Sequence, residues 1–122
     1  MDRKYDYKQL AVFQESKSLV MMVYTSLRHF PREEQFALCD QLRRAVISVP
    51  SNIAEGSGRI SVKDQAHFFE IAYGFLLEVE CQMDIAYSLS YVSSEEKDLI
   101  AAQINKVAAM LSGLRSKCLS RQ

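Results

Sequence analysis

The sequence has little glycine and proline and no pattern of paired cysteines. Only four of its 122 residues are Gly and two are Pro, too few for the many turns of a β-sandwich or barrel. The three cysteines, at positions 39, 81 and 118, lie far apart and form no C-x-x-C pair. This spacing is typical of neither a disulfide framework nor a zinc site, so we expect three reduced thiols.

The sequence also lacks an excess of charge of either sign and a long apolar run. Fifteen Lys and Arg cancel fifteen Asp and Glu, so the composition is not that of a strongly basic nucleic-acid-binding protein. No apolar stretch approaches the roughly 18 residues that a membrane span needs, and no apolar signal-peptide segment follows the first residues. We therefore expect a cytoplasmic protein with no membrane partner.

The charges are nevertheless distributed unevenly along the chain. Residues 1–63 have a balance of +3, residues 64–104 a balance of −7 and residues 105–122 a balance of +4. Two interpretations remain open. The charges lie on solvated helix faces, with cations near a helix C-terminus, or the basic surfaces contact a polyanion or the acidic surface of another copy.

Apolar residues recur with a helical period through four segments, and no convincing alternating stretch is present. The pattern predicts helices over about 8–29, 32–55, 62–90 and 94–118. With short connections, it predicts an all-α fold: one domain over residues 1–122 that is an antiparallel up-down-up-down four-helix bundle. The core stripes expected on the second and third helices are Phe36, Cys39, Leu42, Val46, Val49 and Ile53, and Phe68, Ala72, Phe75, Val79, Met83, Ala86 and Leu89.

Single residues predict how these helices begin, bend and end. Pro50 lies inside the second apolar stripe, which favours one helix kinked near Pro50 over two short ones. Gly56 suits a left-handed cap at the end of that helix. Ser61 and Ser93 each stand three residues before an acidic residue, the spacing of a capping box, and are expected to begin the third and fourth helices.

No pattern in the sequence predicts catalysis or metal binding. A di-iron bundle needs two Glu-x-x-His motifs, whereas the chain has only His29 and His67, with one acid-x-x-His spacing at 64–67. The Gly-x-Gly at positions 56–58 follows a predicted helix, not a strand, which favours a helix–helix turn over a phosphate loop. We predict a protein that is not an enzyme and has no catalytic residue, metal or cofactor.

Four polar residues form a row beside the apolar stripe of the second predicted helix. Steps of four, four and three separate Arg44, Ser48, Asn52 and Glu55, so they lie along one helix face. One interpretation is a structural network at the corner between the second and third helices, in which Glu55 pairs with an arginine. The other is a recognition surface.

The same segment resembles the 23S rRNA intervening-sequence protein family, also known simply as four-helix bundle proteins. The resemblance extends from about residue 10 to residue 115, and its most specific part is the run Asn-Ile-Ala-Glu-Gly at 52–56. The matching residues are Phe30-Pro31, Glu34, Leu38, Gln41 to Ala45, Ser48, Asn52 to Gly56, Gly58-Arg59, Ser61, Phe68, Ile71-Ala72, Gly74, Glu78 and Glu80.

This resemblance implies a non-enzymatic bundle that assembles with copies of itself. A relative, the accessory variability protein of diversity-generating retroelements, is a fivefold ring that binds a reverse transcriptase and nucleic acid through a basic surface. By analogy we expect a ring-like homo-oligomer, a pentamer, that associates with RNA or an RNA-handling protein. The polar network implied by the family motif consists of Ser48, Asn52, Glu55, Gly56, Gly58 and Glu78.

The residues that we predict to contact phosphate are Arg43, Arg44, Arg59 and Lys63, because we expect them to cluster around the corner between the second and third helices. The second candidates are Lys106, Arg115, Lys117 and Arg121. An alternative role for Arg43 or Arg44 is an ion pair with Glu78 or Glu80. The alternative function is a protein–protein adaptor that does not bind nucleic acid.

Overall fold

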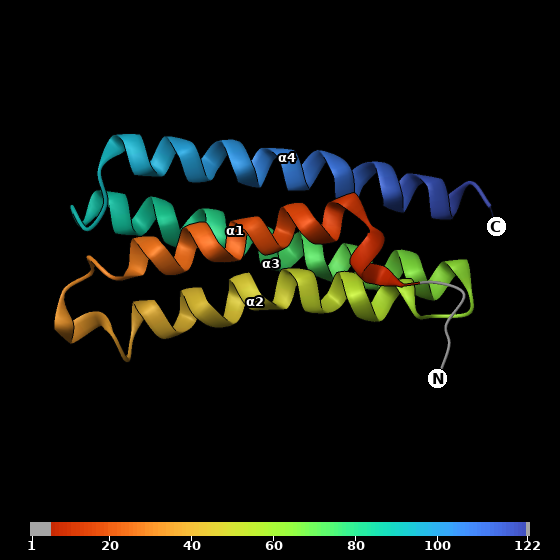
Figure 1. Cartoon of the computed structure of the whole chain (residues 1–122), viewed down its shortest axis with the longest axis horizontal. Coiled ribbons are helices and arrows are strands. Elements are labelled where there is room, and N and C mark those ends of the chain that lie inside the picture. The colour runs from red at the N-terminus through yellow and green to blue at the C-terminus, as the bar shows by residue number, and fades with distance from the viewer. Residues whose placement is uncertain (1–5, 122) are drawn as a thin grey trace.

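The computed structural model describes residues 6–121, and within them it is a bundle of four long helices. The helices are α1 (Ala11–Leu27), α2 (Leu38–Ser57), α3 (Val62–Ser88) and α4 (Ser94–Leu119), with 3-10 turns η1 (Tyr7–Gln9) and η2 (Arg32–Glu34). They run antiparallel side by side, so the start of α1, the end of α2, the start of α3 and the end of α4 lie at one end (Figure 1). The predicted all-α four-helix fold is confirmed.

One apolar core runs through the bundle. Neighbouring helices pack in the order α1–α2–α3–α4, and α4 also packs against α1. The largest fully buried side chains come from all four helices: Leu19, Val23, Leu42, Val46, Val49, Ile53, Leu76, Val79, Ile104, Val107 and Leu111. Their three- and four-residue spacing follows the predicted period, which is why the helical pattern was visible in the sequence.

The start of the second helix was predicted wrongly. After Pro31 the chain forms the 3-10 turn η2, and α2 begins at Leu38 instead of Arg32. Because the backbone at Ala37 is not helical, the spacing from Phe36 to Cys39 no longer places both on one face. Phe36 is 92% exposed, whereas Cys39 is completely buried.

The core stripe of the third helix was also partly wrong. Phe69 and Leu76 are buried, whereas the predicted Phe68 and Phe75 are only partly buried and Leu89 is 49% exposed. The predicted Ala72, Val79, Met83 and Ala86 are buried, and only Phe68 and Phe75 are replaced in the core by the residues that follow them.

The ends of α3 are set by hydrogen bonds of recognisable type. At its start, the Ser61 hydroxyl accepts from the Asp64 amide at 3.0 Å, as the predicted cap requires. At its end, Ser90 has φ 66°, the amide of Ser90 donates to the Tyr87 carbonyl and that of Tyr91 to the Ala86 carbonyl, both at 2.9 Å. These two bonds form a Schellman motif with serine at the usual glycine position.

Two predictions for α2 have different outcomes. The helix continues through Pro50 as one element, as expected, while the kink there stays a prediction. The left-handed cap at Gly56 was wrong: α2 extends past Gly56 to Ser57, and among the described glycines none has a positive φ. Gly56 is buried inside the helix, where it has a packing role described below.

Candidate functional site

The four predicted phosphate-binding residues do not form one cluster. Arg43 and Arg44 lie in the first half of α2, whereas Arg59 and Lys63 lie beyond its end. Fifteen residues separate Arg44 from Arg59, which corresponds to about 22 Å along a helix. The expected cluster was wrong, because even the predicted helix over 32–55 puts Arg43 and Arg44 about three turns before its end.

Arg43 is engaged in the turn before α2. Its guanidinium donates to the Asp40 carboxylate at 2.8 Å, to the Gln35 side-chain oxygen at 2.9 Å and to the Gln35 carbonyl at 3.1 Å. Within the chain it therefore pairs with Asp40, not with Glu78 or Glu80. Arg44 is exposed and forms no ion pair with the residues that the structure describes.

The polar row on α2 bonds to its own helix. The Ser48 hydroxyl donates to the Arg44 carbonyl and the Asn52 amide to the Ser48 carbonyl, both at 2.7 Å. Glu55 is exposed and, within residues 6–121, makes no ion pair with an arginine. The interpretation that Glu55 pairs with an arginine therefore does not hold among residues 6–121, while the local bonds of Ser48 and Asn52 are structural.

A second polar contact joins α2 to α3. The Gln82 amide nitrogen lies 3.3 Å from the Glu78 carboxylate and 3.4 Å from the Gln41 side-chain oxygen. Glu78, which the family motif includes, thus accepts a hydrogen bond from its own helix. Gln82 is only 6% exposed, and its buried oxygen has no hydrogen-bond partner in the described part of the chain.

The corner between α2 and α3 is built around Gly56. A Cβ atom at Gly56 would lie 2.8 Å from the Phe68 Cβ and 2.9 Å from the Phe69 ring, so only glycine lets the two helices approach this closely. Phe68, which this packing holds at the helix edge, lies under the Arg59 guanidinium, 4.4 Å from the ring centroid. This cation–π contact positions Arg59 at the corner while its charge stays exposed.

The fold brings the end of α4 next to this corner. Ser57 and Gln65 from the corner, together with Lys117 of α4 and Arg121 just past its end, line one hollow of about 480 Å³. The Cys118 thiol contacts the Gln65 side-chain oxygen across it at 3.7 Å. Arg59 and Lys63, which we predicted as first candidates, therefore lie at the same end of the bundle as two of the second candidates, Lys117 and Arg121.

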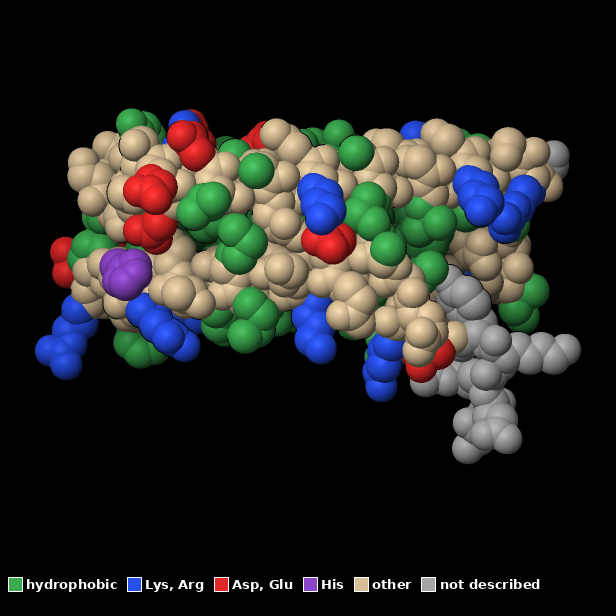
Figure 2. Space-filling model, turned by 45° about the horizontal axis from the view of Figure 1, so that its top comes forward, with side chains coloured by type: hydrophobic (Ala, Val, Ile, Leu, Met, Phe, Trp, Pro, Cys, Tyr) green, Lys and Arg blue, Asp and Glu red, His purple; other side chains and the backbone are tan. Residues whose placement is uncertain are grey.

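We call this end the basic end and define it by five exposed cations. None of them forms an ion pair within the described residues, whereas Lys106 pairs with Glu15 at 3.3 Å and Arg115 with Glu70 at 3.7 Å. Basic side chains are visible on α4 toward its C-terminus in Figure 2. The residues of the basic end are Lys8, Arg59, Lys63, Lys117 and Arg121.

The opposite end of the bundle is acidic. Its turns and helix ends place Glu33, Glu34, Glu95, Glu96 and Asp98 around the starts of α2 and α4. These five acids are accompanied by Arg28, Arg32 and Lys97 at the same end, and the five cations of the basic end by Asp6, Glu55 and Asp64. The two ends therefore differ in sign by a small excess that the formal charge of zero does not reveal.

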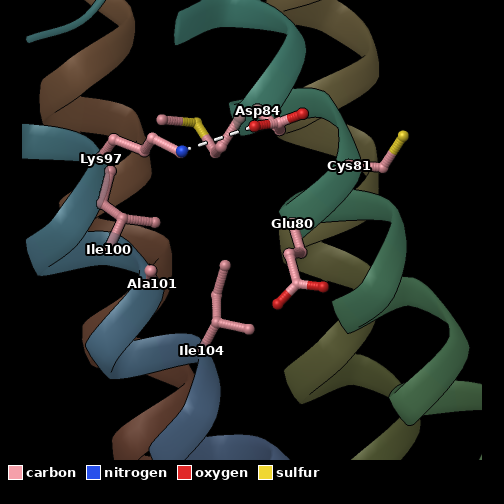
Figure 3. A pocket seen from close by; sticks show the side chains of 8 residues that line it. Glu80, Cys81, Asp84, Lys97, Ile100, Ala101 and Ile104 are labelled. Carbon is pink, nitrogen blue, oxygen red and sulfur yellow. Dashed lines mark ion pairs between the residues drawn. The ribbon is translucent and has the colours of Figure 1, made fainter. Parts of the chain in front are cut away.

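A hollow between α3 and α4 is lined by the acidic side chains of Glu80 and Asp84. In Figure 3 Lys97 reaches across it to Asp84, 3.5 Å away, while Cys81 points away from Lys97. Lys97 also lies over the Tyr87 ring, 4.6 Å from its centroid. Within residues 6–121 no three His, Cys, Asp or Glu side chains are grouped as metal ligands would be. Burial raises the pKa of the Cys39 thiol, which disfavours the reactive thiolate.

None of the described helices combines the length and the apolar character that crossing a membrane requires.

Comparisons with known proteins give one family model and one solved structure with the same fold. The sequence model of the 23S rRNA-intervening sequence protein matches residues 8–113. A crystal structure of a protein of unknown function from the S23 ribosomal protein family of Bacteroides thetaiotaomicron superposes with a TM-score of 0.77. It is 19% identical, and the alignment covers 86% of this chain and 98% of the other. No curated protein sequence matches this chain.

Proposed function

The chain belongs to the 23S rRNA-intervening sequence protein family, and from this membership and the charge of the basic end we propose that it is a non-enzymatic, homo-oligomeric RNA-binding protein of the cytoplasm. The proposed assembly is a ring of five copies, as the resemblance to the fivefold retroelement protein implies. The proposed RNA contact is the basic end.

The observation that supports this proposal is the convergence of unpaired cations at the basic end. Arg59 and Lys63 come from the α2–α3 corner, and Lys117 and Arg121 come from the last turn of α4 and the residues after it. Phosphate contacts need exposed cations that are not already neutralised by carboxylates. In a ring, five such ends would add their fields, which offsets the zero net charge of one chain.

The test is the binding of RNA as a function of salt. A labelled single strand of about 30 nucleotides is titrated with the protein, and four phosphate contacts per copy give a slope of about −3 in log affinity against log salt. The double variant Lys63→Glu with Lys117→Glu should reduce the slope by about 1.4 for each copy in contact with the strand. Fluorescence anisotropy at four salt concentrations measures both quantities.

The matched control reverses two cations elsewhere. Lys17→Glu with Arg44→Glu changes the net charge equally, at exposed positions of α1 and α2 outside the basic end. An equal loss of affinity in both double variants would mean that only net charge matters, and would contradict the assignment. The mass of each variant is measured beforehand, so that a change in assembly is not mistaken for a change in RNA contact.

A protein–protein adaptor is the second candidate, and an apolar groove between α1 and α4 favours it. Met21 is 63% exposed and Leu99 59% exposed along this groove. An apolar interface responds little to salt. An oligomer that does not bind RNA even at low salt would therefore contradict the RNA-binding proposal and support the adaptor.

A further inference from the structure

The groove between α1 and α4 is an apolar surface that no side chain from residues 6–121 fills. It has a volume of about 550 Å³, and its floor and walls include Met21, Met22, Leu99 and Ile100. Hydrophobic side chains gather between the two helices on this face of the molecule (Figure 2). Methionines adapt their shape to a partner side chain, so the groove suits a bulky apolar group.

The same chain exposes a large apolar side chain, that of Phe36, to solvent. Phe36 is 92% exposed, whereas the next most exposed aromatic side chain among the described residues, Tyr87, is 40% exposed. A buried aromatic side chain removes roughly 150–250 Å² from water, so a fully exposed one leaves a large area available to a partner. Aromatic anchors of this kind often dominate the free energy of binding at interfaces.

The turn that presents Phe36 is fixed by neighbouring hydrogen bonds. Arg43 donates to both the carbonyl and the side chain of Gln35, directly before Phe36. The Ala37 amide, directly after it, donates to the Glu34 carbonyl at 3.1 Å. Because the backbone on both sides is held, inserting Phe36 into a partner costs little ordering entropy.

We propose that Phe36 of one copy inserts into the α1–α4 groove of the next copy. The inference rests on the homo-oligomer in the proposed function and identifies its contact surface. Phe36 precedes α2, while the groove lies between α1 and α4, so the two surfaces belong to different helices at the same end of the bundle. A knob and a groove at different places on one molecule form a heterologous interface, which closes into a ring when the rotation allows.

The charges beside the two surfaces suit contact between copies. Arg32 and Glu33 are exposed next to Phe36, while Arg28 and Glu95 are exposed next to the groove-lining His29 and Glu96. Each surface is therefore flanked by one cation and one anion, so neither surface repels a second copy through a net charge. A second copy is also the one partner present whenever the chain itself is present.

The first experiment measures mass by light scattering after size exclusion, without RNA. Phe36→Ser should convert the oligomer to a species of 13.9 kDa, and Met21→Glu should do the same from the groove side. Ile60→Ser is the matched control, because Ile60 is equally exposed but lies beyond the other end of α2. Circular dichroism checks that all three variants remain folded.

Mixing the variants gives a sharper result. Phe36→Ser keeps an intact groove and Met21→Glu keeps an intact Phe36, so one contact forms between them and no further contact follows. A 1:1 mixture should therefore give a dimer of twice the mass of the chain. A wild-type monomer, a Phe36→Ser variant that keeps the wild-type mass, or a mixture that stays monomeric would each overturn the proposal. None of these outcomes depends on RNA, so they are distinct from failure of the proposed RNA binding.

Discussion

Gly56 shows how much a single residue determines about the closeness of two helices. Glycine is disfavoured inside a helix by about 1 kcal/mol relative to alanine, yet here it is buried in α2 against Phe68 and Phe69. The sequence alone indicated a helix cap at Gly56, because glycine is typical both of left-handed caps and of close contacts between helices. Only the position of α3 distinguishes these two roles.

Gly56→Ala is expected to destabilise the bundle. The added Cβ would meet the Cβ of Phe68 at 2.8 Å, which belongs to the less mobile part of that side chain, so the helices must separate. Overpacking of this kind costs about 1–3 kcal/mol, larger than the gain in helix propensity. Chemical denaturation monitored by circular dichroism measures the change in the free energy of unfolding.

Gly74→Ala is the control for this prediction. No atom lies within 4 Å of the position that its Cβ would occupy, and Gly74 is exposed inside α3. It should therefore increase the free energy of unfolding by up to about 1 kcal/mol. If both substitutions stabilise the protein, the close contact at Gly56 does not limit the packing of α2 on α3.

At the scale of helices, the sequence predicted their existence better than their ends. The period of buried residues such as Leu42, Val46 and Val49 identified α2, and the hydroxyl of Ser61 identified the start of α3. The start of α2 was missed because Pro31 is compatible with both an α-helix and the 3-10 turn η2. Phe36 looked like a core residue for the same reason, and this hid the most exposed aromatic group of the described chain.

Helices α1 and α4 are joined by polar contacts that a stripe of apolar residues does not reveal. The Gln103 amide donates to the Glu15 side chain at 3.0 Å and to its carbonyl at 2.8 Å, and Lys106 lies 3.3 Å from the carboxylate. The hydrogen bond from Gln103, followed by the contact with Lys106, holds the pKa of Glu15 below its ordinary value of 4.5.

Glu15 should therefore contribute to stability in a pH-dependent way. Because its pKa is lower in the folded state, the contribution is fully present above pH 4.5 and is lost as the pH falls through the lowered folded value. Glu15→Gln should lower the melting temperature at pH 7. Because the variant has no carboxylate to protonate at this position, its melting temperature should fall less than that of the wild type as the pH drops below 4.5. Thermal melts from pH 7 to pH 3 test this, with Glu55→Gln, which removes an exposed carboxylate without an ion pair, as the control. Parallel curves for wild type and Glu15→Gln would contradict it.

At the scale of the whole molecule, topology determined the candidate site more than any motif did. Arg59 and Lys63 were found from the sequence, but their neighbours Lys117 and Arg121 were ranked apart because 54 residues separate Lys63 from Lys117 in the chain. The up-down order of the helices places all four at one end. Arg43 is a weaker candidate than the sequence indicated, because it pairs with Asp40 in the first turn of α2 and with Gln35 in the turn before that helix.

The two proposals together make a prediction that neither makes alone. If several basic ends face one RNA molecule, the first contact raises the effective concentration of the others, and such linkage strengthens binding by roughly 10²–10⁴-fold. Phe36→Ser removes no cation and lies at the opposite end from the basic end, yet it should weaken RNA binding by about 100-fold and reduce the salt slope to that of one copy. Leu77→Ser, an exposed apolar residue of α3 at 47% exposure, should leave both unchanged. Anisotropy titrations of the three proteins with the same labelled RNA test this prediction. A monomeric Phe36→Ser variant that binds as tightly as the wild type would mean that one basic end contacts the RNA alone.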